Sequence, residues 1–128
     1  MFGDKLLVGQ YELSIDEKNR IIIPAGTARE KDDLIFVVYD ESIDCYKLYA
    51  KQAIEEMFKT LKKAILDSKT EEERICNKKE YLMFCKNILR ERRVDIQGRV
   101  VLGKIVEPGD KVNLIGCGDH FILERKKK

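Results

Sequence analysis

The chain has 128 residues, of which 44% are hydrophobic and 38% charged, and its formal net charge is +2. This length predicts one domain, and the composition excludes a disordered acidic tail or a low-complexity linker. The longest apolar run covers residues 34–39, far short of the roughly 20 residues that span a membrane. The N-terminus has no apolar segment typical of a signal peptide, so we expect a cytoplasmic protein without a membrane partner.

Residues 9–49 are predicted to be mainly β-structure. Tyr11, Leu13 and Ile15 alternate with polar residues, as in a half-buried strand. A β-branched run follows and ends at Pro24, which cannot continue a strand ladder. The expected elements are a strand at 11–15, a turn at 16–20, a strand at 21–23, a helical turn at 25–31, and strands at 34–39 and 45–49.

Residues 50–92 are predicted to form a helical hairpin. Apolar side chains recur at three- and four-residue steps, as in an amphipathic helix. Ser68 and Thr70 are each followed three residues later by Glu, so both are candidate capping-box residues for the second helix. The apolar positions are Ile54, Met57, Phe58, Leu61 and Ile65 in the first helix, and Ile75, Leu82, Phe84, Cys85, Ile88 and Leu89 in the second.

Residues 93–125 are predicted to return to β-structure, and they repeat the first block. A shift of 79 residues places Asp16 on Asp95 and Arg20 on Arg99. The same shift places residues 21–23 on 100–102, 35–36 on 114–115, and 40 on 119, with further strands expected at 112–115 and 121–123. Two matched units predict a pseudo-two-fold domain in which each half supplies part of one sheet or barrel.

Both repeats carry an Asp and an Arg four residues apart in a turn. The Asp side chain can accept hydrogen bonds from backbone N–H groups and hold the loop. The Arg can pair with that Asp and be oriented by it, and a fixed guanidinium suits phosphate or guanine recognition. A surface ion pair that only stabilises the turn is the alternative, although recurrence in two matched hairpins makes the pattern more specific.

The residues GQYELSIDEKNRIIIP (9–24), VDIQGRVVL (94–102) and LIGCGDHFIL (114–123) together resemble the MraZ family of transcriptional regulators. The resemblance covers nearly the whole chain, including the helical insert. It departs from the family pattern at Gly103, where a proline is common, at Asn19, at Gln97, and at Arg29, which lies one residue late.

The resemblance implies an α+β fold. Two pseudo-symmetric AbrB/SpoVT-like swapped-hairpin halves, residues 9–49 and 93–125, would form a β-barrel, with residues 50–92 inserted as a helical hairpin. It also implies a sequence-specific regulator, expected to be a repressor, that binds short direct repeats in promoter DNA, often its own, as a ring-shaped homo-oligomer. We therefore expect association with the nucleoid. The DNA-binding residues carried over are Lys18, Arg20 and Arg99, and Asp16 and Asp95 would fix the loops.

Charge patterning gives modest support to a nucleic-acid partner. Residues 90–104 hold five Arg or Lys against Glu91 and Asp95. Residues 11–33 hold four basic and six acidic residues, so a single protomer is not strongly basic. Several protomers on one DNA would add their weak contacts through effective concentration.

Two other classes of function have weaker support in the sequence. The residues Cys117, Asp119 and His120 provide only half of a zinc-binding pattern, and no Gly-rich phosphate loop is present, so we expect no enzyme, metal or cofactor. The cysteines contain no C-x-x-C pair and are expected to be free thiols. An antitoxin-like or scaffold protein of the same fold, acting through protein contacts, is the alternative to a DNA-binding regulator.

Overall fold

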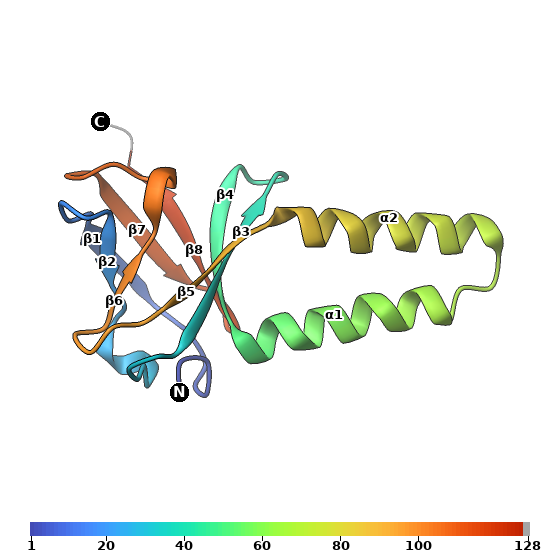
Figure 1. Cartoon of the computed structure of the whole chain (residues 1–128), viewed down its shortest axis with the longest axis horizontal. Helices are drawn as coiled ribbons and strands as arrows, with labels where there is room; N and C mark the ends of the chain where they lie inside the picture. Colours follow the sequence, from blue (N-terminus) through green and yellow to red (C-terminus); the bar gives the residue numbers. More distant parts are fainter. Residues whose placement is uncertain (127–128) are drawn as a thin grey trace.

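A computed structural model describes residues 1–126 and shows a β-rich body from which a helical hairpin projects (Figure 1). The strands are β1 (Gln10–Ser14), β2 (Arg20–Ile22), β3 (Leu34–Asp40), β4 (Cys45–Ala50), β5 (Ile88–Arg93), β6 (Arg99–Val101), β7 (Lys111–Gly116) and β8 (His120–Arg125). The helices are α1 (Lys51–Leu66) and α2 (Glu71–Asn87), with short 3-10 turns η1 (Ala25–Thr27) and η2 (Gly103–Ile105). The α+β class expected from the sequence is confirmed.

The strands form two antiparallel sheets that share one core. Six strands pair in the order β1-β7-β8-β4-β3-β5, and β2 pairs separately with β6 as a two-stranded ribbon. Ile21 and Val100 of the ribbon are buried in the same apolar cluster as Val37, Leu114 and Phe121 of the large sheet. The ribbon therefore packs over one face of the large sheet.

The expected closed β-barrel is not present in the described residues. The large sheet is open, with β1 and β5 as its edges. The chain leaves these edges at the turns that begin with Asp16 and Asp95 and continues into β2 and β6. Those short strands form their ladder with each other, so the ribbon covers the opening without joining the large sheet.

The strand pairing follows the internal repeat. Ile21 lies opposite Val100, the residue that the 79-residue shift matches to it. Two backbone hydrogen bonds flank this pair, one on each side. The N–H of Ile23 donates to the Gly98 carbonyl at 2.8 Å, and the N–H of Leu102 donates to the Asn19 carbonyl at 2.7 Å. In the large sheet, β1 of the first half pairs with β7 of the second, and β5 of the second pairs with β3 of the first. Each half thus contributes strands to both sheets, and at each edge of the large sheet a strand of one half pairs with a strand of the other.

The register corrects the later part of the predicted repeat. Val37 lies opposite Arg90 on β5, and Leu114 lies opposite Tyr11, which is the repeat mate of Arg90. The mate of Leu114 is therefore Val37, not the Ile35 that the constant shift gave. The connection from β6 to β7 is two residues shorter than that from β2 to β3, which displaces the alignment. Continued from Val37 and Leu114, the same register matches residue 40 with 117, so the predicted match of 40 with 119 is also wrong.

The second helix ends earlier than predicted. Residues expected to continue the helix to 92 form strand β5, in which half-buried and exposed side chains alternate. The helical assignment was wrong here because charged residues in Ile88–Arg93 have good helix propensity, whereas pairing with β3 selects the extended backbone. The helical turn expected over residues 25–31 is also shorter, because Ala28 adopts a left-handed backbone with φ 59°.

The helical hairpin is joined mainly by aromatic packing. The ring of Phe58 on α1 lies 5.1 Å from that of Phe84 and 5.8 Å from that of Tyr81, both on α2. Only Ile54 of α1, and no residue of α2, is fully buried. Neither helix is long and apolar enough to cross a membrane, nor is any other helix in residues 1–126.

One of the two candidate capping boxes caps α2. The hydroxyl of Thr70 accepts a hydrogen bond from the Glu73 backbone N–H at 3.0 Å. The Ser68 hydroxyl instead donates to the Ala64 carbonyl at 2.8 Å. Thr70 therefore marks the helix start, and Ser68 belongs to the end of α1.

We expect Thr70→Ala to lower the free energy of unfolding by about 1 kcal/mol, since it removes the cap of α2. Thr60→Ala makes the same chemical change at an exposed position inside α1, where we expect a change within about 0.5 kcal/mol. Urea unfolding followed by circular dichroism measures both. Equal losses in the two variants would contradict the role assigned to the cap.

Candidate nucleic-acid interface

The first Asp–Arg turn is held by three hydrogen bonds to one carboxylate. Oδ1 of Asp16 accepts from the backbone N–H groups of Lys18 and Arg20, both at 2.9 Å. Oδ2 accepts from Nε of Arg20 at 2.8 Å. Asn19 takes the left-handed conformation, with φ 58°, that lets the chain reverse. The carboxylate thereby fixes both the loop and the direction of the Arg20 side chain.

The second turn repeats this geometry. Oδ1 of Asp95 accepts from the backbone N–H groups of Gln97 and Arg99 at 2.9 and 2.8 Å. Oδ2 accepts from Nε of Arg99 at 2.8 Å. Gly98 takes the left-handed position, with φ 80°. Two separate segments of sequence thus build the same local structure, as the repeated Asp and Arg predicted.

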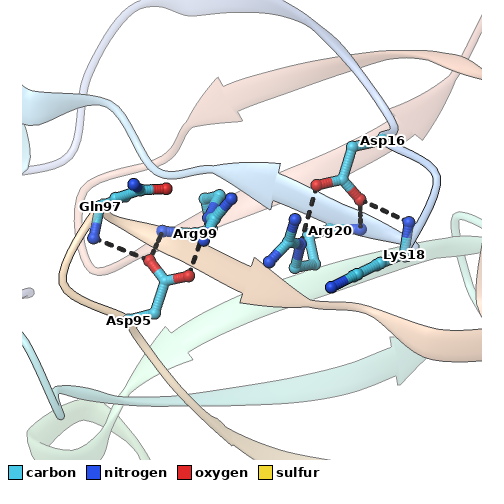
Figure 2. A network of polar contacts seen from close by, with 6 residues as sticks. All are labelled: Asp16, Lys18, Arg20, Asp95, Gln97 and Arg99. Carbon is cyan, nitrogen blue, oxygen red and sulfur yellow. Dashed lines mark hydrogen bonds and ion pairs between the residues drawn. The ribbon is translucent and has the colours of Figure 1, made fainter.

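The two arginines lie on the same outer face of the ribbon (Figure 2). Arg20 is paired with Val101 and Arg99 with Ile22, so these four side chains share one face. The opposite face carries Ile21 and Val100, which are almost completely buried. The structure brings the two sequence-predicted arginines together, although they are far apart in the chain.

Two exposed apolar side chains complete this face, and the sequence analysis missed them. Ile22 is 54% exposed and Val101 is 39% exposed. Both belong to β-branched runs that the sequence predicts to be strands. The signal was available in the period-2 alternation of strands, which puts the middle residue of each run inward and its neighbours outward.

Each arginine keeps hydrogen-bonding capacity beyond its aspartate. The bonds run to Nε, and within residues 1–126 the Nη nitrogens of Arg20 and Arg99 make no hydrogen bond. The side chains are 18% and 29% exposed, respectively. A guanidinium held at Nε with its Nη groups available can donate two parallel hydrogen bonds to an acceptor pair.

The aspartates are ionised over the physiological range. Burial raises the pKa of Asp16, but the backbone and guanidinium hydrogen bonds of Arg20 and the Lys18 backbone N–H outweigh it and lower the pKa below its ordinary value. The pKa of Asp95 is lowered by the same balance, with Arg99 and Gln97 as the donors. Both ion pairs are therefore formed at neutral pH.

The tips of the two turns differ in chemistry. Lys18 is exposed at the first tip, and Gln97 occupies the matching place at the second. The side chain of Asn19 donates to the carbonyls of Gly103 at 3.0 Å and Val106 at 3.3 Å. The symmetric frame therefore carries a cation at one tip and a neutral amide at the other.

At the second tip, Gly98 has no side chain to match that of Asn19, and the Arg29 side chain packs there instead. Its Nε donates to the Ile23 carbonyl at 2.5 Å. Its guanidinium lies so close to Gly98 that a Cβ on that residue would overlap it. Glycine suits this position because its φ is positive and because it leaves room for the Arg29 guanidinium.

The residues considered as half a zinc site form a different arrangement. Nδ1 of His120 lies 2.6 Å from Oδ1 of Asp119, and its ring stacks on Tyr49 with centroids 4.7 Å apart. In residues 1–126, no three His, Cys, Asp or Glu side chains are grouped as metal ligands. All four cysteines are free thiols.

The groove between the helical hairpin and the large sheet is largely apolar. It has a volume of about 600 Å³, and its lining includes Ala53, Met57, Leu61 and Phe84. Asp119 lies at its margin.

Comparison of the chain with models of known protein families gives no match, and comparison with curated proteins gives none either.

We expect Gly98→Ala to destabilise the protein more than Gly109→Ala. Both glycines have positive φ, but Gly109 has open space around its Cα, so its alanine meets only backbone strain of about 1–2 kcal/mol. At Gly98, alanine must also displace the Arg29 guanidinium from its hydrogen bond to the Ile23 carbonyl, which adds about 0.5–1.5 kcal/mol. Urea unfolding of both variants tests this, and equal losses would show that Arg29 does not support the turn.

We expect the stabilisation by the two aspartates to disappear in acid. Because each pKa is lower in the folded state, the stabilisation is complete above the ordinary carboxyl value of about 4 and is lost as pH falls through the lowered pKa. The Tm of the wild type should therefore fall more steeply between pH 6 and pH 2.5 than that of the double variant Asp16→Asn/Asp95→Asn.

The control for this pH series is Glu17→Gln. It removes the carboxylate of an exposed residue in the same turn, and this side chain makes no hydrogen bond within residues 1–126. This variant should follow the wild-type pH profile. A double Asn variant with the wild-type profile would show that the two carboxylates do not contribute to the acid transition.

Proposed function

We propose that the protein is a sequence-specific DNA-binding transcriptional regulator that uses the outer face of the β2–β6 ribbon. The observation that carries this proposal is the pair of aspartate-oriented arginines, Arg20 and Arg99, on one face about a pseudo-two-fold axis. A two-stranded ribbon fits the width of the DNA major groove. The resemblance of the repeats to the MraZ family points the same way, with swapped-hairpin halves as the corresponding fold.

The chemistry of this face suits base-edge and phosphate contacts together. The free Nη groups of Arg20 and Arg99 can donate to O6 and N7 of guanine. The exposed Ile22 and Val101 between them can pack on thymine methyl groups. Lys18, at the tip of the first turn, would contact a phosphate and set the register.

Self-association would supply the affinity that one protomer lacks. The net charge of +2 is small for a DNA-binding protein, so several ribbons acting on repeated sites would add their contacts. The edge strands β1 and β5 and the exposed apolar residues of the helical hairpin offer surfaces for contacts between copies. The exposed residues are Leu66, Ile75, Leu82 and Met83. In full, the proposed regulator is a ring-shaped homo-oligomer at the nucleoid. It binds short direct repeats in promoter DNA and represses transcription.

The exposed helical hairpin also supports a second candidate, a scaffold or antitoxin-like protein that acts through protein contacts. Leu66, for example, is 84% exposed at the end of α1. This reading requires no DNA contact from the ribbon. A protein that assembles normally but shows no preference for any duplex would favour it.

The test is fluorescence-anisotropy titration against a duplex from upstream of its own coding sequence, with a scrambled duplex and a salt series. We expect Arg20→Ala to weaken specific binding by about 1–3 kcal/mol, which is roughly 5- to 150-fold in Kd. The slope of log K against log salt should decrease by about 1 if a phosphate contact is lost as well. Arg99→Ala should weaken specific binding to a similar extent.

Two further variants separate orientation from charge. Arg20→Lys keeps the charge but loses the planar fork, so it should retain most of the salt dependence and lose sequence preference. Arg74→Ala removes an exposed arginine on α2 and should bind as the wild type does. Wild-type affinity and specificity in Arg20→Ala would contradict the assignment of the ribbon.

A further inference from the structure

Strand β5 directs two arginines toward the interior at positions where the first half has Tyr and Leu. Arg90 and Arg92 are half-buried on the inward face of β5, and their repeat mates on β1 are Tyr11 and Leu13. The Nε atoms of both arginines are buried and have no hydrogen-bond partner in residues 1–126. The frame is symmetric here, but the side chains are not.

Gly103 makes room for these guanidinium groups. It occupies the position that matches Pro24 in the first half, and its φ of +72° is one that other residues rarely adopt. A Cβ at Gly103 would overlap Nη1 of Arg90 and would lie 3.5 Å from Nη2 of Arg92. Nη1 of Arg90 also donates to the Leu102 carbonyl at 3.4 Å, which is a long hydrogen bond. Both guanidinium groups therefore lie close to the backbone of Gly103.

No carboxylate neutralises this pair within the described residues. Neither arginine takes part in an ion pair there, whereas Arg20 and Arg99 each have an aspartate. Glu91 lies on the opposite face of β5, and Asp95 is engaged by Arg99. Two neighbouring, partly desolvated cations without an anion are costly, and an oxyanion with several acceptor atoms relieves that cost.

The pair lies beside the first turn. The backbone of Leu102 donates to the Asn19 carbonyl at 2.7 Å, and the Asn19 side chain donates to the Gly103 carbonyl at 3.0 Å. The segment 102–103 is therefore in contact both with Asn19 and with the guanidinium group of Arg90. Lys104, in η2, adds another exposed cation. The second turn has Tyr11 and Leu13 at the matching places.

We propose that Arg90 and Arg92, with the backbone at Gly103, form a phosphate-binding site that takes a DNA backbone phosphate next to the first turn. This inference rests on the proposed DNA-binding function, and it predicts that the two turns make unequal contacts with DNA. The first turn, with Lys18, Arg20 and the new site, makes the stronger phosphate contacts. The second turn contributes mainly base-edge and apolar contacts.

The experiment compares salt dependence in the full-length protein. The double variant Arg90→Gln/Arg92→Gln should lower the slope of log K against log salt by about 1–2, while the ratio of specific to scrambled affinity stays as in the wild type. The matched control is Arg93→Gln, an exposed arginine on the opposite face of the same strand, which should keep the wild-type slope.

A second measurement keeps the proposal testable if the double variant does not fold. In the wild type, the NMR signals of the Arg90 and Arg92 Nε–H groups should shift on titration with inorganic phosphate, while that of Arg93 should not. Absence of this shift overturns the site. An unchanged salt slope in a folded double variant that loses its oligomeric state also overturns it, because the anion would then be a carboxylate of a second copy.

The outcomes separate this inference from the proposed function. If Arg20→Ala abolishes sequence preference and the double variant binds with the wild-type slope, the ribbon function stands and the phosphate site fails. If the double variant loses slope while Arg20→Ala is neutral, the site stands and the ribbon reading fails. A wild type that binds no duplex at low salt overturns both.

Discussion

The pairing of β2 with β6 is the constraint on which the rest of this structure depends. It places Ile21 opposite Val100, and this register puts both side chains into the core while Arg20 and Arg99 face outward. A slip of one residue would exchange the two faces, burying the guanidinium groups and exposing the apolar pair. The outer face of the ribbon is thus a direct consequence of burial on its inner face.

The two Asp–Arg turns of this protein share one backbone geometry but have different neighbouring side chains. The two Asp–Arg turns agree to within 0.1 Å in each of their three hydrogen bonds. Their surroundings differ, since Lys18 is matched by Gln97, and Arg90 and Arg92 are matched by an aromatic and an aliphatic residue. Backbone hydrogen bonds set the frame and tolerate this divergence, because the side chains that differ lie at the margin of the shared core. The result is two similar turns with different electrostatic environments.

The helical hairpin interrupts the repeat between β4 and β5 and creates a second surface away from the ribbon. Its aromatic contacts hold α1 to α2, but they bury little of either helix. The ribbon presents oriented cations, whereas the hairpin presents apolar residues on a charged background. These two surfaces differ in charge and polarity, and they lie on different parts of the chain (Figure 1).

The sequence by itself determined the local structures, because they depend on residues close together in the chain. The Asp–Arg turns, the alternation in β1 and the cap at Thr70 all follow from neighbours within four residues. Tertiary structure alone decided the open sheet, the conversion of Ile88–Arg93 from expected helix to strand, and the shared face of Arg20 and Arg99. Each of these rests on hydrogen bonds between strands about 50 to 100 residues apart, whose register no local propensity encodes. The gathering of Arg90 and Arg92 at Gly103 has the same origin, since only the folded chain brings β5 against η2.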